Sequence, residues 1–522
     1  MTDFIQMGIV AKRGIQSSII NYIGVLIGVL NVLFLFPKYL SPEQFGLFRL
    51  LQDIPWFFAL FVQLGASSVT DRFFQYFKDE QKKNNGFLLL ILLYPLVGYI
   101  LFVSIFFGFA SYWKSFYAER SPLVVDYFFY IAPLTLFIMY SVILEAYLRA
   151  HLNVLFSNFL REVLIRIFFC IMIALFATDI INFDQFVFLL TVSYGINMLL
   201  ILLYIRKKKL LWLNCNFGFK RNQSIYRNIL KYLLYLIPAS AGGVIAQKID
   251  SMMLGSISGK GVNEGLVHVA IYALAFHIAS FIEVPRRSIN QISIPLLSKA
   301  FKENDLTQVN ILYKKNSLIQ FLSGVFIFSL VWININEIFF LLPKGHVYVA
   351  GKYVLLIIGL ARLIDMVTSI NSEVIQFSEH YRFNTLAVVI LGVSTIVFNL
   401  IFIPNIAIIG AAIALFISVS LYNYIKTYYI WKKLHIHPFS SSMIPLVLIL
   451  SISILAEWVL PNARQGYMAA TGTVLLRSIL YVVCFYIVFR KLRISEDANL
   501  LVESIIKKLS KRKYLAWTKM LL

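Results

Sequence analysis

Long apolar runs recur along the chain and are separated by short polar loops. Each run approaches the roughly 20 residues that a helix needs to cross a hydrocarbon core of about 30 Å. The runs lack the alternation of β-strands and are about twice as long as a barrel strand. The pattern predicts an all-α polytopic membrane protein. About fourteen transmembrane helices are expected at 14–36, 47–68, 87–110, 124–148, 159–177, 184–205, 230–255, 266–285, 317–335, 349–377, 384–403, 407–431, 443–460 and 472–489.

Composition supports a membrane location and excludes a water-soluble fold. Of 522 residues, 60% are hydrophobic and 14% charged, and the mean hydropathy is +0.79. No water-facing fold could cover so many apolar side chains. The first run is full length with no small-residue cleavage pattern after it, so we expect it to remain as the first helix. Cys170, Cys215 and Cys484 have no metal-ligand spacing, so we expect neither a metal nor a cofactor.

The net charge of +22 is distributed unevenly between the two sets of loops. Most Lys and Arg fall in alternate loops, at 12–13, 72–83, 206–227, 286–315, 432–433 and 490–519. This positive-inside asymmetry predicts that both termini lie in the cytoplasm. Topology accounts for most of the basic excess. Attraction to anionic membrane lipids is a secondary effect. We therefore expect no nucleic-acid partner.

The chain divides after six predicted spans, and the next six echo the first. Because six is even, the two halves would enter the membrane in the same orientation, as parallel repeats with a cleft between two bundles. The predicted domains are an N-terminal six-helix bundle, a cytoplasmic linker, a C-terminal six-helix bundle, two additional helices and a basic cytoplasmic tail. Their bounds are 1–209, 210–228, 229–435, 436–490 and 491–522.

The predicted span 349–377 carries the densest set of polar residues. An ionisable side chain at mid-bilayer costs at least about 2.5–3.5 kcal/mol, so such residues usually face a bundle interior or a wet cavity. At helical spacing the set forms one stripe. Its members are Arg362, Asp365, Ser369, Ser372, Glu373 and Gln376. We expect this face to line a cavity. A structural ion pair between Arg362 and Asp365 is the alternative, and it leaves Glu373 unexplained.

Two further spans carry charges with a similar choice of interpretations. Glu145 lies near the end of 124–148, in the repeat position of Glu373, and could line a cavity or pair with Arg149. Arg49 and Asp53 share one face of 47–68 and could line a cavity or form an interfacial salt bridge.

Lys248 and Asp250 lie within one predicted span, 230–255. Two residues apart, they are separated by about 200° around a helix, so they need different partners. We expect Asp250 to face the companion bundle and Lys248 to face the cleft as a cationic residue. A structural or snorkelling lysine is the alternative.

Five motifs resemble the polysaccharide-transporter branch of the multidrug/oligosaccharidyl-lipid/polysaccharide exporter superfamily, the Wzx-type O-antigen or capsule flippases. They are YLSPEQFGLFRLLQ, LGASSVTDRFF, EAYLRA, IPASAGGVIAQKIDSMMLGSISG and VAIYALAF. The resemblance covers most of residues 10–435. It implies two six-helix bundles around a central cavity and alternating access. Lipid II flippases of the same superfamily also have fourteen helices, which keeps that function open.

The resemblance implies a non-enzymatic function, namely transfer of a polyprenyl-pyrophosphate-linked oligosaccharide across the bacterial inner membrane. Other polysaccharide-assembly proteins are possible partners. Candidates for binding the anionic head are Lys248, Arg362 and Arg49. Candidates for cavity lining, or for coupling to H⁺ or Na⁺, are Asp365, Glu373, Glu145, Asp250, Ser369, Gln376 and Asp53.

Three alternative functions are considered beside this one. A cation-coupled multidrug exporter of the same fold would favour a cavity of net acidic character. A membrane glycosyltransferase or polymerase is disfavoured because every predicted outer loop is short. A non-transporting scaffold would not need the polar stripe of span 349–377.

The charge distribution yields a direct test of topology. A reporter that is active only outside the cytoplasm, fused after Leu522, should stay silent because both termini are expected inside. A strong external signal would show that the number of spans is odd.

Overall fold

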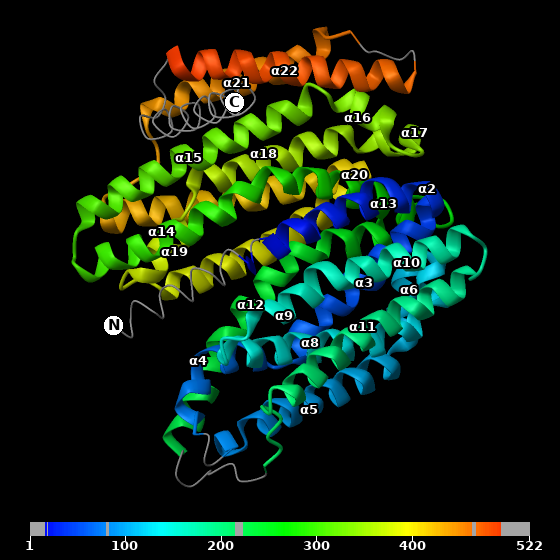
Figure 1. Cartoon of the computed structure of the whole chain (residues 1–522), viewed down its shortest axis with the longest axis vertical. Coiled ribbons are helices and arrows are strands. Elements are labelled where there is room, and N and C mark those ends of the chain that lie inside the picture. The colour runs from blue at the N-terminus through cyan, green and yellow to red at the C-terminus, as the bar shows by residue number, and fades with distance from the viewer. Residues whose placement is uncertain (1–15, 18, 80–82, 215–222, 462–465, 492–522) are drawn as a thin grey trace, which may run out of the picture. The chain divides into compact units, whose positions relative to one another are not determined.

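The computed structural model describes residues 16–17, 19–79, 83–214, 223–461 and 466–491. The basic residues at 12–13, Cys215 and the tail from 492 onward lie outside these ranges. Within them, all regular structure is helical, as the ribbons of Figure 1 show. The all-α prediction is confirmed.

The helices follow one another with short connections. The first helical run, Ile19–Tyr39, ends in η1 (Leu30–Leu35) and α2 (Phe36–Tyr39). It is followed by α3 (Pro42–Val62), α4 (Ala66–Phe77), α5 (Phe87–Gly108), α6 (Ala110–Ala118), α7 (Pro122–Asp126), α8 (Ile131–Ala150), α9 (Val154–Phe159), α10 (Ile165–Ala177), α11 (Phe183–Lys207), α12 (Gln223–Ile257) and α13 (Glu264–Ser280). The others are α14 (Val284–Lys302), α15 (Leu306–Trp332), α16 (Ile335–Leu341), α17 (Gly345–Tyr348), α18 (Lys352–Thr368), α19 (Asn371–Phe377), α20 (Arg382–Leu434), α21 (Ile444–Val459) and α22 (Tyr467–Lys491). Short segments such as η4 (Leu160–Leu164) and η5 (Phe281–Glu283) join some of them.

Eleven helical runs among the described residues are long and apolar enough to cross a membrane. The chain is therefore a multi-pass membrane protein. One run, α20, contains non-helical residues at Ile406 and Ala407, just after Pro404. Proline removes a helical hydrogen bond, and the positive φ of Ala407 reverses the local backbone, so the continuous label covers two helices.

The described residues form two compact units that interleave along the chain. Unit 1 comprises 1–277, 342–354 and 385–418, and unit 2 comprises 278–341, 355–384 and 419–522. This division by compactness differs from the predicted division into sequence halves. The predicted repeat stays a prediction.

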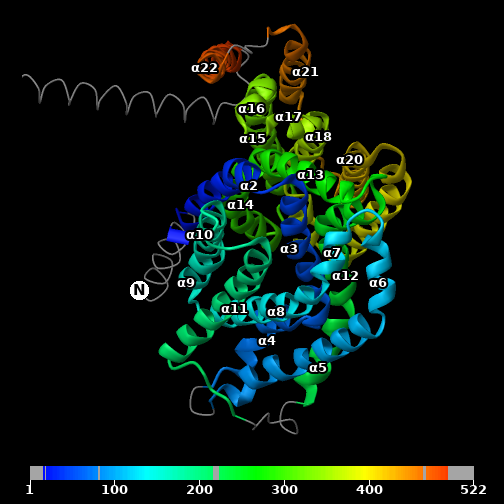
Figure 2. The same ribbon diagram turned by 90° about the vertical axis from the view of Figure 1, so that its right-hand side faces the viewer.

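Unit 1 is organised around α3, which packs against α8 and α12 (Figure 2). Its start is set by a capping box. The Ser41 hydroxyl accepts from the Gln44 backbone N–H at 3.2 Å, and the Gln44 side chain accepts from the Ser41 N–H at 2.9 Å. Pro42 occupies the first turn, where no helical hydrogen bond is lost. The SPEQ sequence thus fixes where α3 begins.

Close backbone contact fixes α3 against the segment that starts α13. A Cβ placed on Gly46 would lie 1.9 Å from the Leu266 carbonyl oxygen. No side chain fits at that distance, so glycine permits the approach.

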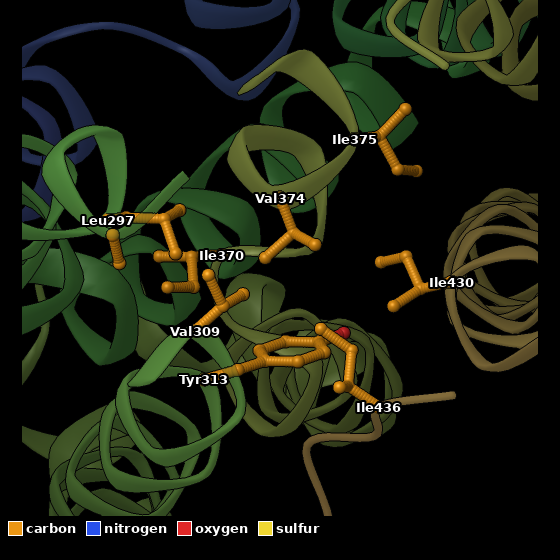
Figure 3. Packing of buried hydrophobic residues seen from close by; sticks show 9 residues of the cluster. Leu297, Val309, Tyr313, Ile370, Val374, Ile375, Ile430 and Ile436 are labelled. Atoms are coloured by element: carbon orange, nitrogen blue, oxygen red, sulfur yellow. The ribbon is translucent and has the colours of Figure 1, made fainter. Parts of the chain in front are cut away.

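Unit 2 has an apolar core where α14, α15 and α19 meet the second part of α20. Figure 3 shows Leu297, Val309, Tyr313, Val374 and Ile430 pointing toward one another. All five are almost fully buried. Close van der Waals contact among these side chains holds α19 in place.

The C-terminal pair α21 and α22 packs on α15 and α16 of the same unit (Figure 1). Arg477 of α22 bonds to Glu337 of α16 at 2.9 Å, and their side chains are 10% and 2% exposed. Asn336 donates to Glu457 of α21 at 2.8 Å. The two additional helices are therefore attached by buried polar contacts as well as by apolar packing.

The glycine contact predicts a specific stability defect. Gly46→Ala should lower stability by about 1–3 kcal/mol, because overpacking forces the backbones apart. The matched control is Gly108→Ala, since nothing lies within 4 Å of a Cβ there. The measurement is the midpoint of thermal aggregation of each purified variant in detergent. Equal midpoints for the two variants would contradict the predicted clash.

Candidate functional site

A buried carboxylate between two cations joins α3 to α12 within unit 1. Asp53 Oδ2 accepts from Arg49 Nε at 2.7 Å, and Asp53 Oδ1 accepts from Lys248 Nζ at 2.5 Å. The Asp53 side chain is 1% exposed, whereas those of Arg49 and Lys248 are 30% and 22% exposed. Two cations around one anion leave a net charge of +1, and the cations are the accessible members. We call these residues the cationic cluster.

Asp250 faces a different set of helices. Its Oδ2 accepts from the Tyr272 hydroxyl on α13 at 2.7 Å, and its Oδ1 accepts from Asn399 Nδ2 on α20 at 2.6 Å. The predicted need for different partners is therefore met. The predicted direction of Asp250 was wrong, because Asp250 contacts helices of its own half. Lys248 contacts α3 of the N-terminal half, and its expected position facing the cleft stays a prediction. Spacing sets the angle between two side chains but not which neighbour each one meets.

Glu145 lies in a second ionic chain of unit 1, beside a cavity of about 270 Å³. Arg161 Nη1 bonds to Glu145 at 2.8 Å and its Nε bonds to Glu162 at 3.1 Å. Arg166 extends the chain to Glu162 at 3.0 Å. These four residues line the cavity together with Gln52, Trp56, Ile138, Ser141, Val142, Ile165, Phe169, Tyr194 and Asn197.

The expected pairing of Glu145 with Arg149 is replaced by pairings with other helices. Arg149 bonds to Asp71 of α4 at 3.0 Å. Arg161, which supplies the partner of Glu145, lies in η4. Glu145 borders the cavity, and the role expected for it there stays a prediction.

A third ionic cluster lies within unit 2. Arg286 contacts Glu283 at 3.4 Å and Asp365 at 3.3 Å, and Arg362 contacts Glu283 at 3.3 Å. Asn423 also donates to Asp365, at 2.7 Å. Glu283 of η5 and Arg286 of α14 therefore link Arg362 to Asp365.

The predicted stripe is interrupted at Ser369. This buried residue has φ +50°, and α18 ends at Thr368 before α19 begins at Asn371. Glu373 consequently lies on a separate short helix, where its Oε2 is buried with no hydrogen-bond partner among the described residues. Gln376 is exposed. The continuous helix assumed from the sequence was wrong, because a left-handed residue stops the regular backbone pattern.

Several charged residues of these clusters are absent from the sequence-based candidates. Lys426 is fully buried on α20 and donates to Ser372 and to the Tyr422 hydroxyl. It lies inside a predicted span, so the cost of inserting a charge could have identified it. Arg161 and Arg166 could have been found in the same way. Arg286 was assigned to a basic loop, although α14 begins before it.

The fold is similar to that of several solved transporters. The "Lipid II flippase MurJ, inward closed conformation" aligns with TM-score 0.67 and 15% identity, covering 92% of this chain and 99% of that chain. An inward-facing multidrug resistance MATE family transporter of the MOP superfamily gives 0.58 and 14%, covering 79% and 94%. A MOP superfamily transporter from Pyrococcus furiosus, described as having a binding pocket of reverse polarity, gives 0.53 and 16%, covering 81% and 95%. At these identities the likeness concerns the fold.

The sequence itself gives the family. The model of the family described as "Polysaccharide biosynthesis protein" matches residues 10–301, more than half of the chain. The chain belongs to this family and is a multi-pass membrane transporter of it. The predicted resemblance is confirmed. Among curated proteins, none matches the sequence.

The cluster of unit 2 predicts a difference between two adjacent arginines. Arg286→Gln should lower stability by about 1–3 kcal/mol, because it removes a partner of two partly buried carboxylates. Arg287→Gln is the matched control, since Arg287 is exposed and such substitutions usually change stability by less than about 0.5 kcal/mol. Thermal midpoints of the purified proteins measure the difference. A control that is as damaging as the test variant would refute the assignment.

Proposed function

We propose that the protein is a flippase that transfers a polyprenyl-pyrophosphate-linked oligosaccharide from the cytoplasmic to the outer leaflet of the bacterial inner membrane. The observation that carries this proposal is the cationic cluster. Arg49 and Lys248 keep accessible charge inside apolar helices, and their single shared carboxylate leaves one positive charge in excess. A pyrophosphate is an anion that this excess would attract.

The physical chemistry of such a substrate fits the protein. Its lipid tail can remain in the bilayer, whereas its head needs a polar path through the protein. An interior-negative membrane potential favours outward movement of an anion, by about 2.3 kcal/mol per charge for each 100 mV crossed. Arg362, which lies in the ionic cluster of unit 2, is a further candidate contact for the head.

We infer fourteen transmembrane helices with both termini in the cytoplasm. Counting α20 as two spans and adding α12 and the run from α9 to α10 raises the eleven candidate spans to fourteen. The 35 residues of α12 exceed the length needed to cross a bilayer. Charges of Arg161, Glu162 and Arg166 lower the hydropathy of the run from α9 to α10, and their pairing reduces the cost of insertion.

Coupling to a cation, either H⁺ or Na⁺, is assigned to the buried carboxylates. Asp250 is 3% exposed and accepts hydrogen bonds from two neutral groups. Glu373 has an unpartnered buried oxygen among the described residues. A proton or metal cation at either carboxylate would reduce the cost of burying its charge.

The charge of the cationic cluster disfavours a multidrug exporter of cationic compounds, because like charges repel. A lipid II flippase would take the same kind of anionic head. Membership in the polysaccharide biosynthesis family favours the oligosaccharide-linked substrate over the peptidoglycan precursor.

Replacement of Lys248 tests the proposed binding of the head group. Lys248→Ala should lower surface-glycan export by at least about tenfold, since removing one member of a buried charge pair costs about 2–5 kcal/mol. Lys248→Arg should retain part of the activity, because it keeps the charge with a different geometry. Export is measured in cells that lack the native copy, with protein abundance measured in parallel.

A double variant separates binding from structure. Asp53→Asn combined with Lys248→Met removes both members of the pair, and Arg49 keeps the net charge of the cluster at +1, so this variant tests whether Lys248 itself contacts the head. We expect normal abundance with export still absent. Recovery of export in the double variant would show that Lys248 serves only to neutralise Asp53.

A further inference from the structure

The cavity beside Glu145 differs in charge from the cationic cluster. Its charged lining residues are two arginines and two glutamates, so their formal charges cancel. Arg161 is held between Glu145 and Glu162, and Glu162 also bonds to Arg166. The cavity is therefore polar but neutral. It suits an uncharged ligand with many hydroxyl groups better than it suits a pyrophosphate.

A residue that borders the cavity carries a buried acceptor that lacks a donor among the described residues. Asn197 on α11 is 5% exposed and donates through Nδ2 to Ser141 at 3.4 Å. Its Oδ1 is buried and has no hydrogen-bond partner among the described residues. An unsatisfied buried acceptor costs about 1–3 kcal/mol, so a ligand hydroxyl in the cavity toward which the Asn197 amide turns would recover that energy.

Aromatic rings complete the lining. Trp56 of α3, Phe169 of α10 and Tyr194 of α11 border the same space as Gln52 and Asn197. The flat apolar face of a pyranose ring packs well on an aromatic ring, while amides and carboxylates bond to its hydroxyl groups. At about 270 Å³ the volume matches one sugar residue better than a whole oligosaccharide.

One helix connects this cavity to the cationic cluster. Arg49, Gln52 and Trp56 follow at helical spacing on α3, so they lie along one face. Gln52 and Trp56 line the cavity, and Arg49 belongs to the cluster. A pyrophosphate at Arg49 would therefore place the sugar attached to it near the cavity.

We propose that this cavity is a glycan subsite that binds the sugar residue next to the pyrophosphate, with Asn197, Gln52 and Trp56 as its specificity-determining residues. The inference rests on the proposed flippase function and adds that two separate regions bind the two parts of the head. The cationic cluster binds the charge common to all such lipids, and the neutral cavity discriminates between sugars.

The experiment compares two lipid probes on the purified full-length protein. One is polyprenyl pyrophosphate without sugar. The other is the lipid-linked oligosaccharide extracted from source cells in which this transporter is deleted. Dissociation constants are measured for the wild type, Asn197→Leu, Trp56→Leu and Lys248→Ala. Thr191→Val is the matched control, because Thr191 is buried on α11 and bonds only within its helix in the described structure.

We expect Asn197→Leu and Trp56→Leu to weaken binding of the glycosylated probe about tenfold and to leave binding of the bare lipid unchanged. Lys248→Ala should weaken both probes, and Thr191→Val neither. Equal loss for both probes in the Asn197 and Trp56 variants, or no loss for either, overturns the glycan subsite while leaving the flippase proposal intact. If the wild type binds neither lipid, the flippase proposal itself is overturned. Thermal midpoints of all variants identify any loss caused by misfolding.

Discussion

The high cost of unpaired charge in a membrane accounts for the most specific contacts of this protein. Asp53 can be buried because Arg49 and Lys248 approach it, and Lys248 comes from a helix 195 residues further along the chain. The contacts of Glu145 with Arg161 and of Asp365 with Arg286 follow the same rule. Neutralisation therefore also selects which helices lie together, since apolar faces alone discriminate poorly between partners in lipid.

Helix α3 links this constraint to transport. Its capping box and its glycine contact fix its start and its distance from the segment at Leu266. Successive turns then place Arg49 and Asp53 in the cationic cluster and Trp56 at the cavity. A helix held so firmly can position charged and neutral parts of a ligand relative to each other, because both proposed binding regions share one backbone.

The class of protein was predictable from the sequence because a membrane imposes length and hydropathy on every span. Two charges two residues apart on one helix also had to find different partners. The identity of those partners was not predictable. The helix period fixes the angle between Lys248 and Asp250 around the helix axis, but it carries no information about Asp53 or Asn399. The break at Ser369 was missed because no glycine or proline marks it. Arg286 was misplaced because charge counting assigns arginines to loops by default.

The ion pair between Arg477 and Glu337 has a consequence for biosynthesis. Its members are 140 residues apart, so the carboxylate is made and inserted long before the guanidinium that neutralises it. Until α22 enters the membrane, Glu337 lacks that neutralising charge and the end of α16 is less stable. The pair thus makes full stability of unit 2 depend on completion of the chain. A nascent chain that ends before α22 therefore lacks the contact that neutralises Glu337, although the preceding helices are already complete.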